Sequence, residues 1–419
     1  MTEKTKMARW IPLYEKSKEL IFKNKLSSAM LAVAFFSWLS IISFGSKFYA
    51  DEKYHYRQIK TFLAGKFEVI DMLTTIPGYH AFMSFFAALS GDISVMKVRI
   101  ISFALALLIL PVFFFIAKKF NDSNSFSLQK TALLAVLPIS FIYFPLVYTD
   151  LFSALLFFCS FLLIISGRYH LAALISIASV TTRQNNIVWH VFLWVYPYFS
   201  SHGFDLRLLT LWSYLKKTYL FPIGIAAFGL FVFLNGGIAI GDKGSHQAGF
   251  YLGNIYFFLA ISAVLFAPYL VYRLTRARHL YSGKMLLSGL FVGLAISASF
   301  LLNPPMLHGY NLDSRFLRNI FLGNIYHGNQ WLYALMIFVG YLALHTTKLR
   351  EKSWIIYPFS FLYLLPSWLI EQRYSIIPLM LLLLFKEKEA SFVERIQLIY
   401  FATISGLLLY MILATKIFF

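Results

Sequence analysis

The segment Ile100–Phe115 reads IISFALALLILPVFFF and contains no charged residue. Segments of the same character recur at Leu26–Phe44, Phe221–Leu234, Tyr251–Tyr272 and Leu398–Thr415. They approach or reach the roughly 20 apolar residues that a helix needs to cross a bilayer. The ten-residue segments of alternating polarity that are typical of a membrane barrel are not found in the sequence. The pattern therefore predicts an all-α polytopic membrane protein.

The composition supports this interpretation. Of the 419 residues, 59% are hydrophobic and 13% are charged, against roughly 45–50% and about 25% in an ordinary soluble domain. A net charge of +19 would favour a nucleic-acid partner in a soluble protein, but here the basic residues lie in short loops between apolar segments. Because no nucleic-acid-binding motif accompanies them, no nucleic-acid partner is expected. The single cysteine, Cys159, excludes a disulfide within the chain.

The basic residues also predict the direction in which the chain crosses the bilayer, because cytoplasmic loops carry an excess of lysine and arginine. Residues 1–25 are expected to form a cytoplasmic tail, followed by a retained anchor. Residues 49–97 then form the first outer loop, in which Pro77–Leu89 is too short to span and is expected to be an interfacial helix.

Following the basic turns along the whole chain predicts one membrane domain of about 13 transmembrane helices. The expected spans are 26–48, 98–117, 131–147, 151–166, two short helices across 169–199 that break around Thr181–Asn186, 218–238, 250–271, 284–302, 330–346, 354–369, 375–385 and a last span ending at 419.

On this topology, the polar motifs gather on the outer face. Asp51 and Glu52 follow the first span, where they could be a solvated helix end or supply a general base for a sugar hydroxyl. Arg183 lies among amides inside an apolar region, where an ionisable group is usually functional or paired. Arg315, Arg318 and Arg373 lie near the lipid boundary, where they either snorkel to head groups or bind a lipid phosphate.

Other classes of function have less support. The sequence contains no phosphate-binding loop, dinucleotide fingerprint, zinc spacing or serine-hydrolase elbow, so nucleotide-driven and hydrolytic chemistry are not indicated. A transporter or flippase would place its charged residues near the bilayer midplane and show an internal repeat, and neither feature is found. A channel would show a polar stripe along one helix, and none is seen.

Five motifs, taken in order along the chain, resemble those of the dolichyl-phosphate-glucose-dependent alpha-1,2-glucosyltransferases. They are Tyr49-Ala50-Asp51-Glu52 with His55, Gln58 and Asp71 to Gly78; Phe144 to Asp150; Arg183 to Trp189; Asn235 to His246; and Glu371 to Pro378. A weaker match is Leu312 to Phe316, where the family's Asp-Asn-Arg-His reads Asp313-Ser314-Arg315-Phe316. The central cytoplasmic loop, which is extended in the family, is reduced here to about 200–217.

The resemblance implies a GT-C architecture at the endoplasmic reticulum membrane, with a luminal active site, or at the inner membrane of a bacterium. It implies glucose transfer from dolichyl-phosphate-glucose onto the glucose-terminated arm of a dolichyl-diphosphate-linked oligosaccharide, with inversion at the anomeric carbon. A transferase for another sugar or acceptor, mannosyl or bacterial lipid-glycan, is the alternative. The leaving group is a phosphate monoester rather than a diphosphate, so neither a cofactor nor an obligatory metal is expected.

The resemblance also implies roles for individual residues. Asp51 is expected to be the base, with Glu52 orienting or replacing it, and the donor phosphate is expected to be bound by Arg183, Arg315 and Arg373. The remaining expected substrate-binding residues are His55, Asp71, Thr75, Asp150, Gln184, Asp242, His246, Asp313 and Glu371. Asp242 and His246 could equally belong to a hydrated loop.

Overall fold

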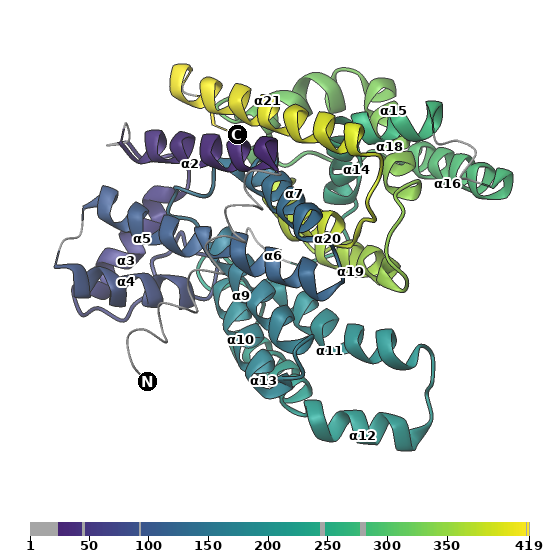
Figure 1. Cartoon of the computed structure of the whole chain (residues 1–419). Helices are drawn as coiled ribbons and strands as arrows, with labels where there is room; N and C mark the ends of the chain where they lie inside the picture. The colour runs from purple at the N-terminus through teal and green to yellow at the C-terminus, as the bar shows by residue number, and fades with distance from the viewer. Residues whose placement is uncertain are drawn as a thin grey trace, which may run out of the picture.

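The computed structural model describes residues 24–43, 47–91, 94–243, 248–276, 282–415 and 417–418. The regular structure of these ranges is helical, apart from two isolated backbone bridges (Figure 1). The helices are α2 (Lys25–Ser43), α3 (Glu52–Leu63), α4 (Gly78–Ser90), α5 (Val95–Leu107), α6 (Ile109–Lys119), α7 (Asn124–Ala135), α8 (Pro138–Phe141), α9 (Thr149–Ile164), α10 (Tyr169–Thr182), η1 (Gln184–Asn186), α11 (Ile187–His202), α12 (Leu208–Thr218), α13 (Leu220–Asn235), α14 (Gly253–Leu265), α15 (Ala267–Thr275), α16 (Gly283–Leu302), η3 (Gly309–Leu312), α17 (Leu317–Phe321), η4 (Leu322–His327), α18 (Gln330–His345), η5 (Ser353–Ile355), α19 (Ile356–Leu364), η6 (Gln372–Ser375), α20 (Ile376–Phe385) and α21 (Ser391–Ala414).

Four helical segments of the described chain are long and apolar enough to cross a bilayer: α2, the continuous pair α5 and α6, α16 and α21. Two further pairs, α12 with α13 and α14 with α15, meet the same criterion together but bend by 73° and 68°. By length and composition, the described residues thus contain four to six candidate spans rather than the expected 13. The other apolar helices, among them α9, α10 and α18, have only 10–17 residues.

The expected span 131–147 shows why fewer long helices form. Helix α7 ends at Ala135, and Leu137 is extended, with a ψ of 114°. The residue before a proline is disfavoured in the helical region, and Pro138 has no amide hydrogen to continue the helix. A stretch that is uniformly apolar in sequence is therefore divided between α7 and α8.

The expected break around Thr181–Asn186 is confirmed. Helix α10 ends at Thr182, a single 3₁₀ turn follows, and α11 begins at Ile187. The side-chain amide of Asn186 donates to the Ser179 hydroxyl at 2.7 Å, which ties the break to the preceding helix. The helix expected at Pro77–Leu89 is present as α4, although nothing in the structure tests its position in the bilayer.

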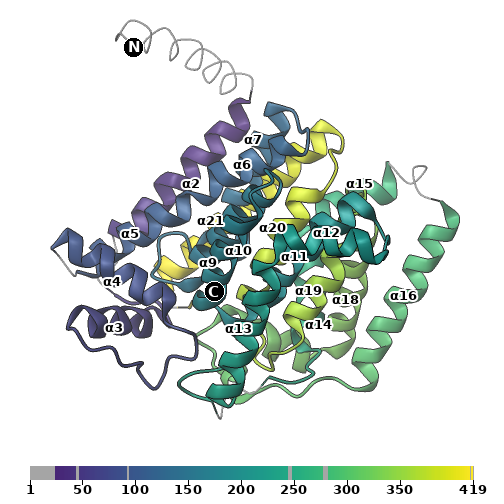
Figure 2. The ribbon, with the colours of Figure 1, turned by 90° about the horizontal axis from the view of Figure 1, so that it is seen from below.

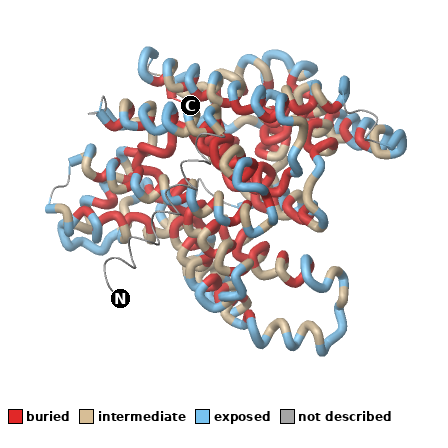
Figure 3. The backbone as a smooth tube through the Cα atoms, viewed as in Figure 1, coloured by how far each residue is buried: buried red, intermediate tan, exposed pale blue. Residues whose placement is uncertain are grey.

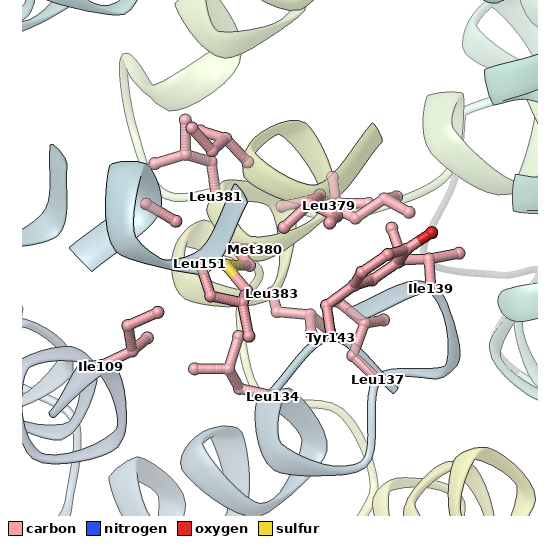
Figure 4. Packing of buried hydrophobic residues seen from close by; sticks show 14 of the residues in the cluster. Ile109, Leu134, Leu137, Ile139, Tyr143, Leu151, Leu379, Met380, Leu381 and Leu383 are labelled. Atoms are coloured by element: carbon pink, nitrogen blue, oxygen red, sulfur yellow. The ribbon is translucent and has the colours of Figure 1, made fainter. Parts of the chain in front are cut away.

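Helix α20 is the centre of the molecule, because all ten of its residues are buried. Figure 4 shows Leu379, Leu381 and Leu383 packed among residues of α7, α8 and α9, including Leu134 and Leu151. A helix that is hydrophobic on every side belongs in the interior of a bundle, and Figure 3 shows the buried residues concentrated there. Helix α20 therefore holds the residues before it at one end of the core and the residues after it at the other.

One end of the bundle carries a buried group of charges, which we call the inner cluster. In it, Asp122 pairs with Lys130 at 3.0 Å and also with Arg350. Its other ion pairs are Arg273 with Glu389 and Lys386 with Glu394, each at 2.5 Å. These charges come from four turns that the charge pattern predicts to be cytoplasmic. Figure 2 shows α7 and α15 at this end and α3 and α4 at the opposite end, so the basic turns gather away from the first outer loop.

Candidate active site

Asp51 lies in a tightly held turn directly before α3. Ala50, which precedes it, has a φ of +49°, a region that residues with side chains rarely adopt. The hydroxyl of Tyr148 accepts from the Asp51 amide at 2.9 Å and donates to the Tyr49 carbonyl at 3.0 Å. The side chain of Asp51 is nevertheless 43% exposed. The turn thus fixes the backbone of Asp51 while its carboxylate stays accessible.

A chain of ion pairs runs inward from Asp51, and we call it the outer chain. Arg373 Nη2 donates to Asp51 Oδ2 at 3.1 Å, and Arg373 Nε donates to Glu371 Oε2 at 2.5 Å. Arg318 Nη2 lies 3.0 Å from the other oxygen of Glu371. Both arginines and Glu371 are largely buried. Residues 371–373 immediately precede α20, so the central helix of the fold positions the middle of this chain.

A second ion pair joins the start of α9 to the break before α11. Arg183 pairs with Asp150 Oδ1, and its guanidinium lies 5.5 Å from the ring centre of Tyr374. The other oxygen of Asp150 is buried and has no hydrogen-bond partner. Buried polar atoms are nearly always satisfied, so an unsatisfied carboxylate oxygen next to an arginine requires an explanation such as a bound group.

Glu52 is adjacent to Asp51 in sequence but is fully buried. Arg99 binds both of its oxygens, with Nε at 2.8 Å and Nη2 at 2.5 Å. Each oxygen also accepts one backbone amide, from Val147 at 3.0 Å and from Tyr49 at 3.2 Å. The carboxylate of Glu52 is therefore occupied with holding the outer loop against the start of α5 and α9.

Two buried histidines, His55 and His80, lie close to the turn that carries Asp51. His55 Nδ1 is 2.9 Å from His80 Nε2, and the His55 ring centre is 5.3 Å from that of Tyr148. Burial, together with the positive charges of Arg373 and Arg183, lowers the pKa of His55 to about 3. Burial likewise lowers the pKa of His80 well below its usual value. Both imidazoles are therefore neutral at physiological pH, and His55 lies within electrostatic reach of both arginines.

Gln184 joins three motifs that are far apart in the sequence. Its amide nitrogen donates to the Thr74 carbonyl at 2.9 Å and to the Ile238 carbonyl at 3.2 Å. The amide of Gly241 donates to the Leu73 carbonyl at 3.0 Å. A Cβ at Gly241 would overlap that carbonyl, so only glycine allows the two loops to approach this closely.

The other predicted residues differ in their placement. Asp71 is exposed, and the Thr75 hydroxyl is buried without a hydrogen-bond partner. Asp242 lies in the loop that Gly241 holds, and His246 is outside the described residues. Asp313 and Arg315 pair with each other at the surface, where the Arg315 side chain is 83% exposed. The structure thus brings together Asp51, His55, Asp150, Arg183, Gln184, Glu371 and Arg373, and it leaves Asp313 and Arg315 paired outside them.

Several residues of the site are not among those predicted from the sequence. Arg318, one of the three arginines expected near the lipid boundary, contacts Glu371. Arg99 and His80 contact the predicted residues, although their local sequence gives no indication of this. Phe418 is a further example, because its ring is 6.4 Å from that of Tyr148. Its backbone pairs with the 315–317 segment at 2.7 and 2.8 Å. Contacts between segments so far apart in the chain leave no periodic signal that could have revealed them.

Within the described ranges, no three His, Cys, Asp or Glu side chains are grouped as a metal ion would require. The ionic groups that are brought together are arginines and carboxylates. Guanidinium groups bind phosphate oxygens through paired hydrogen bonds, whereas an accessible carboxylate can accept a proton. The arrangement is therefore able to bind a phosphate next to a general base.

Comparisons with known proteins relate this site to a family. The model of the DIE2/ALG10 family matches residues 45–203 and 198–384. The Dol-P-Glc:Glc(2)Man(9)GlcNAc(2)-PP-Dol alpha-1,2-glucosyltransferase of Drosophila melanogaster is 25% identical over 382 residues, covering 80% of this chain and 83% of that protein. The enzyme of the same name from Homo sapiens is 22% identical over 397 residues, covering 79% and 82%. The one from Rattus norvegicus is 23% identical over 276 residues, which are 53% of this chain and 58% of that protein.

Proposed function

We propose, from the premise that the chain belongs to the DIE2/ALG10 family, that it is a glucosyltransferase with the activity for which its relatives are named. The donor is dolichyl-phosphate-glucose. The acceptor is the dolichyl-diphosphate-linked oligosaccharide that already carries two glucoses, and the product carries a third glucose in alpha-1,2 linkage. This is the last glucose added to the glycan before its use in protein N-glycosylation.

The observation that carries the proposal is the contact of the half-exposed Asp51 with Arg373 at 3.1 Å. An inverting transfer needs a base for the acceptor hydroxyl and a cation for the leaving phosphate, on either side of the anomeric carbon. Asp51 supplies the accessible carboxylate and Arg373 the mostly buried guanidinium. When the donor phosphate replaces Asp51 as the partner of Arg373, the two groups lie on opposite sides of the anomeric carbon.

The reaction is a single displacement. The acceptor 2-hydroxyl oxygen attacks the anomeric carbon while Asp51 takes the hydroxyl proton. The bond between that carbon and the phosphate oxygen breaks, and its electron pair stays on the phosphate, which leaves as dolichyl phosphate. One displacement converts the beta-linked donor into an alpha-linked product. Because charge develops on the phosphate in a poorly hydrated site, prearranged guanidinium groups stabilise the transition state.

Geometry supports Asp51 rather than Glu52 as the base. Each carboxylate oxygen of Glu52 already accepts one hydrogen bond from Arg99 and one from a backbone amide. Glu52 then acts as a positioning residue that fixes the turn carrying Asp51. The incoming phosphate would compete with Asp51 for Arg373, and this exchange would free the carboxylate to accept the proton.

Arg183 and Arg373 are assigned to the donor phosphate. Both are close to neutral His55, and Arg183 adjoins the unsatisfied oxygen of Asp150. Arg318 supports Arg373 through their shared partner, Glu371. Arg315, which is exposed and paired with Asp313, has a smaller part, at most a contact with the head group or the glycan.

The remaining expected residues are proposed to contact the sugars. Thr75 and Gln184 lie where the first outer loop meets the 238–242 segment, which supports the proposal that they border the donor glucose. Asp71, Asp242 and the predicted His246 belong to the same two loops and are proposed to meet the acceptor glycan.

The architecture is proposed to be a single GT-C membrane domain of about 13 transmembrane helices, with residues 1–25 in the cytoplasm and residues 49–97 in the lumen of the endoplasmic reticulum. The four to six candidate spans support a polytopic protein. The separation of the inner cluster from α3 and α4 supports the assigned sides (Figure 2). In a bacterial cell, the equivalent location would be the inner membrane.

The test supplies membranes that contain the protein with dolichyl-phosphate-glucose and the diglucosylated lipid-linked oligosaccharide, and it measures the triglucosylated product. We expect Asp51→Asn to lower the rate by about 10²–10⁴-fold, the usual contribution of a general base, without lowering the amount of protein. Glu351→Gln, an exposed carboxylate at the opposite end, is the matched control. A fully active Asp51→Asn enzyme would exclude Asp51 as the base, and a preference for a mannosyl donor would favour the alternative transferase.

The same assay tests the expected independence from metal. Activity should be unchanged by a chelator, because a phosphate monoester leaving group provides no second phosphate for a divalent ion to bridge. Loss of activity on chelation, with recovery on adding manganese, would contradict this part of the proposal.

A further inference from the structure

Helix α12 lies at the edge of the molecule in Figure 1. It is far from α3 and α4 in both ribbon views (Figures 1 and 2). It meets α13 at a bend of 73°. If α13 crosses the bilayer, a helix bent by this much lies close to the membrane plane. Trp194 Nε1 donates to the Thr218 hydroxyl at 3.0 Å, and the Tyr214 hydroxyl donates to the Trp194 carbonyl at 2.5 Å, so α12 is fastened to α11.

Between α11 and α12 is a groove of about 590 Å³ with no charged residue in its lining. Its walls include Trp194 and Tyr198 from α11 and Leu208, Leu211 and Trp212 from α12. Leu208 is 82% exposed and Trp212 is 56% exposed. Apolar side chains that remain uncovered on a membrane protein are expected to contact lipid, and a volume of this size is typical of a ligand pocket.

A second hollow, of about 620 Å³, lies at the other end of α12. Arg168, His170, Lys216 and Lys217 contribute to its lining, and no aspartate or glutamate does. Arg168 and both lysines are exposed, and none of them belongs to an ion pair identified among the described residues. The hollow therefore concentrates positive charge without a compensating carboxylate.

The two hollows are continuous along one helix. Leu215, which lines the groove, directly precedes Lys216, which lines the basic hollow. Tyr214 of the groove and Tyr169 of the basic hollow are in ring contact, with centroids 6.3 Å apart. A basic hollow joined to an apolar groove has the polarity of a lipid with an anionic head group and an acyl chain.

We propose that α12 and the turn between α9 and α10 form a binding site for one anionic glycerophospholipid of the bilayer. Its phosphate lies among Arg168, Lys216 and Lys217, and one acyl chain lies in the groove against Trp194 and Leu211. An anionic lipid is favoured over a zwitterionic one because basic groups attract anionic lipid head groups. The lining of the hollow contains no carboxylate that would attract a choline group. This site is separate from Asp51 and does not depend on the proposed glucosyl transfer.

The experiment is native mass spectrometry of the full-length protein, purified in a neutral detergent and titrated with phosphatidylserine or with phosphatidylcholine of the same acyl chains. We expect one bound phosphatidylserine at concentrations at least tenfold below those needed for phosphatidylcholine. The triple variant Arg168→Gln/Lys216→Gln/Lys217→Gln should remove this preference. The control Lys118→Gln/Lys119→Gln/Arg276→Gln makes the same charge change at other basic turns and should keep it.

A second variant tests the groove separately from the head-group site. Leu211→Trp should weaken binding of long-chain phosphatidylserine at least fivefold and leave binding of its dihexanoyl form unchanged. The elution volume of each variant on size exclusion confirms that it is folded.

Three outcomes would overturn the proposal. Equal binding of phosphatidylserine and phosphatidylcholine by the wild-type protein would exclude a head-group site. If both triple variants lost the preference for phosphatidylserine equally, the preference would come from the net charge of the protein rather than from this hollow. Displacement of phosphatidylserine by dolichyl phosphate at the same concentration would identify the hollow as a site for the substrate lipid instead.

Discussion

The outer chain and the inner cluster are built from the same ion pairs but differ in what they leave accessible. In the inner cluster, Asp122, Glu389 and Glu394 are each paired with a basic residue, and no side chain of the three is more than 14% exposed. In the outer chain, Asp51 is 43% exposed. Each region also has a buried carboxylate oxygen without a hydrogen-bond partner, at nearby Asp150 and at Glu389. A buried ion pair by itself is weak support for function. The accessibility of the Asp51 carboxylate, rather than the charge, distinguishes the candidate active site.

The first way to test this comparison is to remove one carboxylate of the inner cluster. Asp122→Asn leaves the buried Lys130 and the partly buried Arg350 without their anion, and breaking a buried pair costs about 3–5 kcal/mol of stability. We expect a clearly lower melting temperature in detergent, with normal specific activity in the folded fraction. The carboxylate of Asp205 binds the exposed Arg207 and the Thr210 hydroxyl, so Asp205→Asn should lower the melting temperature much less. A stable Asp122→Asn protein that has lost its activity would reverse the roles of the two regions.

The next change removes the arginine that joins Asp51 to Glu371. Arg373→Gln should lower kcat by about 10²–10³-fold, the usual cost of losing one donor that stabilises developing charge. Arg373→Lys keeps the charge but not the planar fork, so its rate should lie between those of the wild type and the glutamine variant. Initial rates at saturating donor measure the effect. If the lysine and glutamine variants are equally slow, fork geometry rather than charge is what matters.

The buried histidines predict a pH effect on the outer region. The pKa of His55 is lowered from 6.5 to about 3, because burial and the charges of Arg373 and Arg183 oppose protonation. Above about pH 6.5, His55 is neutral in both the folded and the unfolded protein, so it does not affect stability. As the pH falls from there towards 3, only the unfolded protein binds the proton, and the folded protein loses about 1 kcal/mol of stability per pH unit. Melting temperatures at pH 7.5 and 5.5 should differ less in His55→Gln than in the wild type.

The melting temperature of His55→Gln should still depend partly on pH, because burial also lowers the pKa of His80. The exposed His202→Gln is the control, and its melting temperature should fall with acidification as much as that of the wild type. An equal fall in His55→Gln would show that His55 is protonated in the folded protein.

The smallest effect is expected for Arg315→Gln. Arg315 is 83% exposed, and its ion pair within the described residues is with Asp313. Exposed pairs contribute little, so activity should stay within about twofold of the wild type. Arg318→Gln, three residues further along and buried against Glu371, should be far more damaging. A strong loss in Arg315→Gln with an unchanged melting temperature would place the donor phosphate at the surface position.

Part of the site was predictable from sequence because its signals are local. The position of Asp51 at the end of the first apolar segment and that of Arg183 at a helix break follow from charge within hydrophobic context. The number of long spans was not predictable in the same way. Residues 131–147 carry no charge in sequence, but the backbone before Pro138 is extended. The bends of 73° and 68° beside α13 and α14 appear only in the structure.

The sequence by itself determined a helical membrane protein, the order of its motifs and the turns that carry positive charge, because these depend on how each segment is solvated. The tertiary structure alone decided which of two adjacent carboxylates is accessible and which of Arg315 and Arg318 is buried. Glu52 meets Arg99 across 47 residues, and Asp51 meets Arg373 across 322. Which charged residues become partners depends on how the whole bundle packs around α20, and a local sequence pattern does not contain this information.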